Sequence, residues 1–192
     1  MSIGTDFLNS AISRFGEQKR LGDRTFAQLT GSDMLEQPNE VSNSIAVIIQ
    51  HLNGNMVSRW TNFLTDDGEK EWRKRDDEFE PCTRTKEQLL QLWEEGWSTL
   101  QSTLHSLQEH DLSRTITIRM QPLLVIDAIN RQLSHYAQHV GQIVYLGRWI
   151  KGSDWISLSI SKAGSQEFNE RMKAEGHAHP STNSAARRAP EG

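Results

Sequence analysis

The sequence predicts an all-α protein: a four-helix bundle with a long crossover between helices 2 and 3 and a short C-terminal helical extension. Apolar residues recur at helical spacing in four long segments. The connection between the second and third of these segments is long and carries no apolar stripe. With 192 residues, the chain can bury a substantial core as one domain. Helices of this number and length pack together as a bundle.

The first two predicted helices are separated by a polar loop. The first helix covers about residues 5–29, where apolar side chains follow one face. The stretch "TGSDMLEQPNE" (30–40) concentrates helix breakers and short polar side chains, so it predicts a loop. The second helix begins near Ser42 or Ser44, whose hydroxyl can cap free backbone N–H groups, and runs to about Phe63.

The crossover and the third helix follow. Residues 65–82 alternate acidic and basic side chains with little periodicity, which predicts a long connection with room for a helical turn around Glu71. Thr85 and Gln88 then resemble a capping box, and an apolar stripe continues to about Leu107. These features predict the third helix.

The fourth predicted helix comes after a short β-branched segment. "RTITIR" (114–119) is either a short edge strand or an extended link. Pro122 suits the first turn of a helix that runs to about Lys151 and stops at Gly152. The predicted bundle therefore occupies residues 1–152.

The chain changes character after the bundle. Residues 153–175 include a helical stretch around Gln166 to Ala174, which we expect to pack against the bundle through Phe168. Residues 176–192 are rich in Ala, Ser, Pro and Arg without a stripe, which predicts a disordered tail.

Composition excludes several classes of partner. The net charge of −4 and the pI near 6.0 give no basic field for nucleic acid. No apolar run of about 18 residues occurs, so we expect no membrane span. The start "MSIGTDFLNS" lacks the pattern of a secretory signal, and the single cysteine, Cys82, fits a reducing compartment. A cytoplasmic location is expected.

Two histidines lie four residues apart in "NRQLSHYAQHVGQIVYLGR" (130–148), so His135 and His139 share one helical face. His139 falls within the apolar arc and His135 at its edge, where an unpartnered imidazole nitrogen costs about 1 to 3 kcal/mol. His51 flanks the apolar stripe of the second helix. If these two helices face each other, the histidines form a three-nitrogen metal site with an open position.

The alternative is that the pair hydrogen-bonds to carbonyls or water at the rim of the bundle. His105 and His110 fit solvated or capping roles, and His177 and His179 fall in the predicted tail. No Glu-x-x-His pair occurs, which disfavours a di-iron carboxylate bundle, and no H-E-x-x-H motif indicates a zincin.

The segments "SIAVIIQHLNGNMVSRW" and "HYAQHVGQIVYLGR" together resemble the DinB/YfiT-like superfamily of metal-binding four-helix bundles. "WISLSISKAGSQEFN" (155–169) resembles the C-terminal extension of an uncharacterised branch of it. The resemblance implies that His51, His135 and His139 bind zinc, nickel or iron. It also implies a homodimer and, in some members, chemistry with a low-molecular-weight thiol such as bacillithiol, mycothiol or glutathione.

Three hypotheses for function stay open. The first is thiol transfer to a small electrophilic substrate, because a divalent ion with three neutral ligands lowers the pKa of a bound thiol. The second is metal-dependent hydrolysis with water as the nucleophile. The third is a non-catalytic binding protein that a metal only stabilises. Asn55 and Gln142 could hydrogen-bond to the ligands or lie on the helix surface, and catalytic residues are not assigned.

Overall fold

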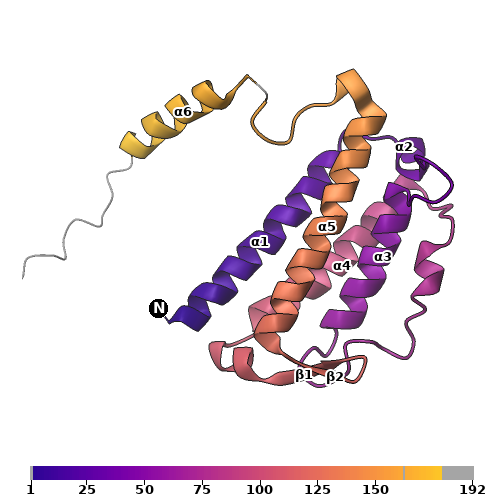
Figure 1. Ribbon diagram of the computed structural model, residues 1–192, viewed down its shortest axis with the longest axis vertical. Coiled ribbons are helices and arrows are strands. Elements are labelled where there is room, and N and C mark those ends of the chain that lie inside the picture. Colours follow the sequence, from indigo (N-terminus) through magenta and orange to yellow (C-terminus); the bar gives the residue numbers. More distant parts are fainter. Residues whose placement is uncertain (1, 162, 179–192) are drawn as a thin grey trace, which may run out of the picture. The chain divides into compact units, whose positions relative to one another are not determined.

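Four long helices form the bundle in the computed structural model, which describes residues 2–161 and 163–178 (Figure 1). They are α1 (Ile3–Phe26), α3 (Ile45–Trp60), α4 (Lys86–Ser106) and α5 (Val125–Lys151). Short elements lie between or after them: α2 (Gly31–Leu35), the 3-10 turns η1 (Asp76–Phe79), η2 (Glu109–Ser113) and η3 (Gly152–Asp154), and the strands β1 (Thr115–Ile118) and β2 (Gln121–Leu124). The predicted all-α bundle is confirmed.

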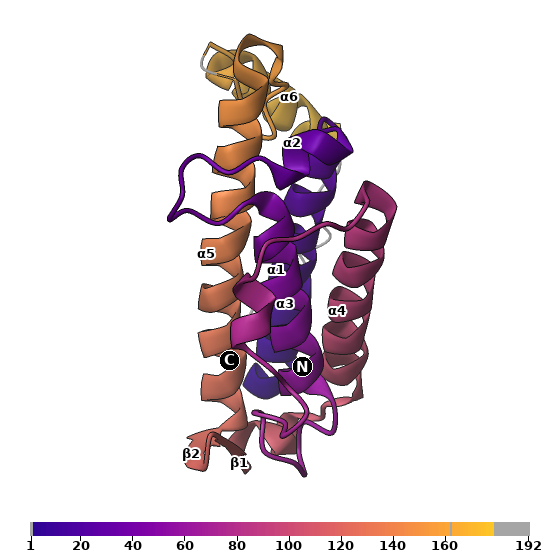
Figure 2. The same ribbon diagram turned by 90° about the vertical axis from the view of Figure 1, so that its right-hand side faces the viewer.

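Helices α3 and α4 run in the same direction. The amide of Asn53 donates to the carbonyl of Leu92, and the hydroxyl of Thr103, further along α4, donates to the carbonyl of Trp60 at the end of α3. A chain that leaves α3 must therefore return along the bundle before α4 can begin. Residues 61–85 make this return, and they pass in front of α3 in Figure 2.

The core of the bundle is built from large side chains that the apolar stripes bring inward. Phe15, Trp60, Trp93, Trp97 and Tyr136 are all fully buried. Phe15 meets Trp60 edge-on, with ring centroids 6.0 Å apart, and Trp93 meets Trp97 at 5.3 Å. Such edge-to-face pairs add to the free energy gained by burial, so the tryptophans on α3 and α4 serve packing.

The predicted helix starts are confirmed at two places. The Ser44 hydroxyl accepts the backbone N–H of Val47, and Thr85 and Gln88 form the capping box of α4. One predicted loop and two predicted helix ends were wrong. A capping box of Thr30 and Asp33 starts α2 inside the predicted loop, the first helix ends at Phe26, and the second ends at Trp60. A single hydrogen-bonded turn lies at Glu71, as expected, where the N–H of Arg73 donates to the carbonyl of Lys70 at 3.0 Å, and the 3-10 turn η1 follows it.

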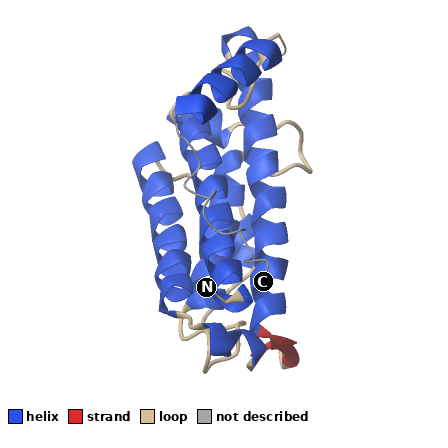
Figure 3. Ribbon diagram, turned by 90° about the vertical axis from the view of Figure 1, so that its left-hand side faces the viewer, coloured by secondary structure: helices blue, strands red, loops and turns tan. Residues whose placement is uncertain are grey.

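The prediction that Pro122 opens the fourth helix was also wrong. Strands β1 and β2 form an antiparallel hairpin, red in Figure 3, in which Thr117 pairs with Pro122, and α5 begins only at Val125. Proline has no N–H to donate, which an edge strand of a two-stranded sheet tolerates. The "RTITIR" segment is thus a strand.

A carboxylate from the crossover holds the tip of this hairpin. Arg119 and Met120 have φ values of 54° and 63°, the left-handed conformation that a two-residue hairpin turn requires. Asp67 accepts the backbone N–H of both residues at 2.8 Å. The hairpin is therefore tied to the crossover, close to the end of α3.

The C-terminal residues form a second compact unit. It begins at Ile156, after the unit that ends at Trp155, and contains α6 (Ser165–Ala178), where the Arg171 guanidinium lies 5.2 Å from the Phe168 ring centroid. Packing of Phe168 on the bundle stays a prediction. The helix extends past the predicted start of the tail at 176, and residues 179–192 lie outside the described residues. Among the described residues, no helix has the length and apolarity needed to cross a bilayer.

Candidate metal centre

Three histidines from two helices meet between α3 and α5. His51 lies on α3, and His135 and His139 lie one turn apart on α5. The Nε2 atom of His135 is 3.3 Å from Nε2 of His51 and 3.1 Å from Nε2 of His139. One ring nitrogen of each residue lies within 4.8 Å of the other two. The structure thus brings the three predicted imidazoles together, and the cluster could hold a metal ion.

Two of the three separations between the ring nitrogens, those that involve His135, suit a tetrahedral ion. Nitrogen ligands about 2.0–2.1 Å from such an ion lie about 3.3 Å from one another. The two Nε2 separations of 3.3 and 3.1 Å are close to this value. The donor set therefore fits a divalent ion that prefers imidazole, and the choice among zinc, nickel and iron is left open by ligand type alone.

The outer nitrogen of two of these rings is fixed by a partner. His51 Nδ1 lies 2.9 Å from Glu78 Oε2, and His139 Nδ1 lies 2.8 Å from Gln142 Oε1. An ionised carboxylate and an amide oxygen only accept hydrogen bonds, so Nδ1 is the donor in both rings. In the neutral ring this leaves the lone pair on Nε2, and both lone pairs lie next to Nε2 of His135. A cation among them would stabilise this arrangement.

Glu78 belongs to a buried network of charges. Arg73 binds it with two hydrogen bonds, Nε to Oε1 at 2.8 Å and a terminal nitrogen to Oε2 at 2.9 Å. Arg73 also reaches Glu69 at 3.3 Å, and Glu69 binds Arg59 at 2.8 Å. Because Glu78 and Arg73 are buried, this fork is held rigidly and fixes the orientation of the His51 ring.

The fold brings Glu78 to His51 through a glycine. Gly54 lies one turn after His51 on α3, and a Cβ at this position would overlap the Glu78 carboxylate. The neighbouring Phe79 ring packs on the His51 ring with centroids 4.8 Å apart. Sequence reasoning missed Glu78 and Arg73. The signal that could have indicated them is the isolated glycine inside a helix, which often marks a close approach.

Burial and neighbouring charge favour the neutral form of the two histidines on α5. Burial, with added repulsion from His139 and His51, lowers the pKa of His135 to about 3. Burial also lowers the pKa of His139, although its bond to Gln142 opposes this. Burial alone would raise the pKa of Glu78, but hydrogen bonds from His51 and Arg73 outweigh it and hold that pKa below its usual value. At neutral pH, His135 and His139 are therefore neutral imidazoles, and Glu78 is an ionised carboxylate beside His51.

The three histidines line a cavity of about 440 Å³, a volume that suits a small-molecule ligand. Its other walls are mostly cationic or amide side chains together with one aromatic ring: Asn55, Arg59, Arg73, Arg75, Phe79, Arg119, Arg131 and Gln132. Among the residues that the structure describes, those lining this cavity include no carboxylate, thiol or hydroxyl group.

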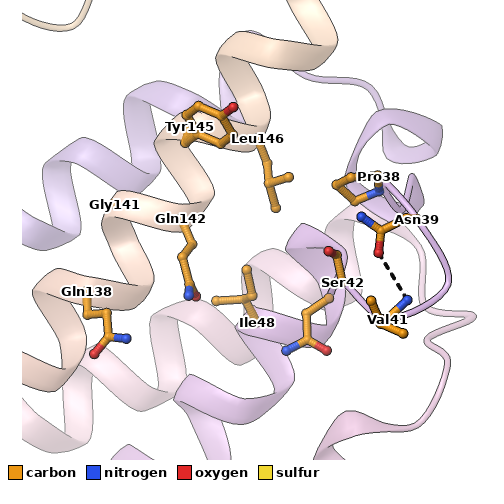
Figure 4. Close-up of a pocket in the computed structure, with 11 residues that line it drawn as sticks. Pro38, Asn39, Val41, Ser42, Ile48, Gln138, Gly141, Gln142, Tyr145 and Leu146 are labelled. Atoms are coloured by element: carbon orange, nitrogen blue, oxygen red, sulfur yellow. Dashed lines mark hydrogen bonds between the residues drawn. The ribbon is translucent and has the colours of Figure 1, made fainter.

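Gln142 connects the cluster with a second cavity of about 760 Å³. Figure 4 shows this cavity between α5, which contributes Gln138, Gln142 and Tyr145, and the loop that precedes α3, which contributes Pro38 and neighbouring residues. The same side chain that holds the His139 ring is therefore accessible from a second hollow in the bundle.

The remaining candidate residues lie as follows. The Asn55 carbonyl accepts the buried Tyr136 hydroxyl at 2.9 Å and contacts no histidine nitrogen, whereas Gln142 does bind a ligand ring. Burial raises the pKa of Tyr136 well above its usual value, so it stays a donor. His105 is exposed and bonds to the carbonyl of Gln101 within its own helix. Cys82 does not line the cavity.

A four-helix bundle with a three-histidine cluster between its second and fourth long helices is the class of protein that this fold and site define. The chain belongs to the family described as "Protein of unknown function (DUF1572)", whose model matches residues 2–164. The match covers the whole bundle and ends just before α6.

One solved structure is similar over most of the bundle. It is described as "Crystal structure of the conserved protein of locus from Enterococcus faecalis", with a TM-score of 0.51 and 19% sequence identity over 80% of this chain and 99% of that chain. At this identity the likeness supports the fold alone. No curated protein matches the chain.

Proposed function

We propose that this protein is a divalent-metal-dependent enzyme of the DinB/YfiT-like superfamily and that it transfers a low-molecular-weight thiol to a small electrophilic substrate. The observation that carries the proposal is the convergence of three imidazoles, His51, His135 and His139, at the wall of a ligand-sized cavity. The Nε2 spacing and the outer partners Glu78 and Gln142 support a resident ion.

The chain's residues define what such a site can do. A divalent ion in this site supplies a Lewis acid, which lowers the pKa of a thiol or a water molecule beside it. Glu78 keeps the Nδ1 proton on His51, and Gln142 keeps the Nδ1 proton on His139, so both rings stay oriented. Phe79 covers one face of the His51 ring and limits access of water from that side.

The composition of the cavity favours a thiol over water as the nucleophile. Hydrolysis benefits from a general base that takes the second proton of water, and the described residues lining the cavity include no carboxylate for this role. A thiol has only one proton to lose. Its sulfur forms a bond to the electrophilic carbon as the bond to the leaving group breaks, the leaving group takes that electron pair, and the thiol proton passes to solvent.

Two further parts of the proposal concern the whole protein. The superfamily resemblance supports a homodimer, which sedimentation equilibrium would test. The single cysteine in the sequence supports a cytoplasmic location. Neither part is needed for the metal site itself.

Metal content is the first test. Protein purified without a nickel column should contain close to one divalent ion per chain by elemental analysis. His51→Ala, His135→Ala and His139→Ala should each lose most of this ion, because removing one of three ligands leaves an incomplete site. His105→Ala, an exposed histidine on α4, is the control and should keep it. Equal metal content in all four variants would contradict the proposal.

Turnover is the second test. Metal-loaded protein mixed with a chromogenic electrophile should react with added thiol and remain inactive without it, and His51→Ala should fall to the uncatalysed rate. Turnover without thiol would instead indicate the hydrolase. If chelation lowers the melting temperature while no reaction with either nucleophile exceeds that of His51→Ala, the protein is a metal-stabilised binding protein.

A further inference from the structure

Five arginines line the cavity beside the three histidines, although the whole chain carries a net charge of −4. They come from separate parts of the fold: Arg59 from α3, Arg73 and Arg75 from the crossover, Arg119 from the hairpin tip and Arg131 from α5. Because these arginines come from four segments, they are not simply the charged, solvent-facing side of a single helix. It defines a local positive field at the candidate site.

The carboxylates that pair with these arginines do not cancel this charge. Glu69 forms ion pairs with Arg59, Arg73 and Arg119. Glu78 pairs with Arg73, and Asp76 pairs with Arg75, so three carboxylates face four arginines. Asp76 is 98% exposed, so solvent screens its pair strongly.

Arg131 differs from the other four arginines. Among the described residues, no carboxylate lies within ion-pair distance of it. It lines the cavity one turn before His135 on the same face of α5. Its guanidinium is therefore available to a ligand.

Two buried polar atoms in the cavity wall also lack a partner. Arg59 is 6% exposed and Gln132 is 3% exposed, and both line the cavity. The Nε of Arg59 and the Oε1 of Gln132 have no hydrogen-bond partner among the described residues. Such atoms cost free energy when they stay unsatisfied. The Arg59 Nε–H is a donor, which suits an anion, whereas the Gln132 oxygen is an acceptor and requires a donor.

We propose that this cavity binds an oxyanion group, a carboxylate or a phosphate, of the small molecule whose reacting atom lies at the three imidazoles. Arg131 is the principal anchor, and Arg119 and Arg75 approach the same cavity from the hairpin and the crossover. This inference rests on the proposed function for the identity of the reacting end, while the anion site itself does not depend on turnover. Guanidinium groups suit both anions because their N–H fork matches two oxygens.

The register of α5 limits the length of the ligand. Side chains four residues apart on a helix have Cβ atoms about 6 Å apart. Arg131 and His135 have this spacing, so the anionic group lies only a few bonds from the reacting atom. The expected ligand class is a short anionic molecule, such as a small mercapto acid or a small electrophile with a carboxylate or phosphate.

Binding of matched thiols to the metal-loaded full chain tests the inference. Calorimetric titrations would compare 3-mercaptopropionate with 2-mercaptoethanol and cysteamine, which are similar in size and differ in charge. Malonate and inorganic phosphate serve as anions without a thiol. Tighter binding of the anions than of the neutral and cationic thiols, by about tenfold or more, is expected for a charge-assisted contact.

Two substitutions of Arg131 and one control substitution on α5 test where the anion binds. Arg131→Gln should weaken anion binding by about tenfold, and Arg131→Lys should lie between it and the unmodified chain. Arg148→Gln, also exposed on α5 but not lining the cavity, is the matched control and should bind as the unmodified chain does. Melting curves of all variants check that they are folded.

The outcomes separate this inference from the proposed function. If none of the anions, malonate and phosphate included, binds more tightly than the neutral thiol, or if Arg131→Gln binds anions as Arg148→Gln does, the anion site is overturned even where His51-dependent turnover persists. If anions bind through Arg131 and no thiol reaction occurs, the anion site stands and the thiol transferase fails. If malonate or phosphate binds while mercaptopropionate binds no more tightly than mercaptoethanol, the anion site stands. In that case the anionic group belongs to the electrophilic substrate and not to the thiol.

Discussion

Glu78 shows how a single side chain can decide the chemistry of a ligand it supports. Its carboxylate accepts a hydrogen bond from Nδ1–H of His51 and itself receives two hydrogen bonds from Arg73. A histidine whose outer nitrogen donates to a carboxylate is a stronger and better oriented ligand. The strength of the candidate site therefore depends on a residue that contributes no ligand atom.

Replacing Glu78 with glutamine should lower metal affinity by about 10- to 100-fold. The amide carries no charge to balance Arg73 and can no longer accept two charge-assisted bonds on both oxygens. Competition with a chromogenic chelator would measure the dissociation constant. Glu80→Gln, an exposed neighbour just after η1, is the control, and equal affinity in both variants would show that Glu78 has no role in the site.

At the residue scale, the sequence predicts those partners that helix periodicity brings together. His135 and His139 are four apart and Gln142 is three further on, so their proximity follows from one helix. His51 comes close to these residues as soon as the apolar faces of α3 and α5 pack against each other. Glu78 cannot be predicted in this way, because it is one of several carboxylates in a charged connection and only the closed tertiary fold selects it.

Among the elements, the long helices follow from their apolar stripes, whereas the short ones depend on other forces. The helix α2 exists because Thr30 and Asp33 cap each other, and the hairpin exists because Asp67 satisfies its turn. The helix α2 leaves no periodic pattern in the sequence, and the hairpin leaves only the short alternation of "RTITIR", which fits a strand and an extended link equally. Pro122 suits either the first turn of a helix or an edge strand, because neither position requires its missing N–H. Its pairing with Thr117 places it in the strand.

The hairpin contact should make stability depend on pH through Asp67. Burial raises the pKa of Asp67, but hydrogen bonds from the backbone of Glu69, Met120 and Arg119 outweigh this and lower it from 3.8 to about 2. A carboxyl with a lowered folded-state pKa stabilises the fold above its unfolded value. This contribution is present above about pH 4 and is lost as the pH falls through about 2.

Asp67→Asn should therefore be less stable than the unmodified chain by about 1 kcal/mol at pH 6. The difference should shrink between about pH 4 and 2, where the aspartate itself becomes protonated. Urea unfolding at several pH values would measure it. A difference that does not change with pH would show that the charge of Asp67 is irrelevant to the hairpin.

For the whole molecule, composition hides the charge distribution that matters. The chain is acidic in total, yet five arginines meet at one cavity. The net charge predicts that the protein has no nucleic-acid surface, but it cannot reveal a pocket assembled from four segments. Such a pocket is visible only after the crossover and the hairpin have folded onto the bundle.

The division of the chain after Trp155 predicts that the bundle folds without the C-terminal unit. Trp155 itself lies against Gly147 on α5, so a truncation should retain it. A chain ending at Trp155 should keep its metal content and a melting temperature within a few degrees of the full chain. Loss of metal or of cooperative melting on truncation would show that residues 156–192 support the bundle.

The parallel direction of α3 and α4 has a consequence for how this site can diversify. Because one connection must travel back along the bundle, it supplies Arg73, Arg75 and Phe79 to the cavity and Glu78 to the outer nitrogen of His51, whereas the histidines lie on the helices. Exchange of that single segment between relatives would give a new ligand preference around an unchanged candidate metal centre. Substitutions in this segment can therefore change which ligand binds while the three histidines stay the same.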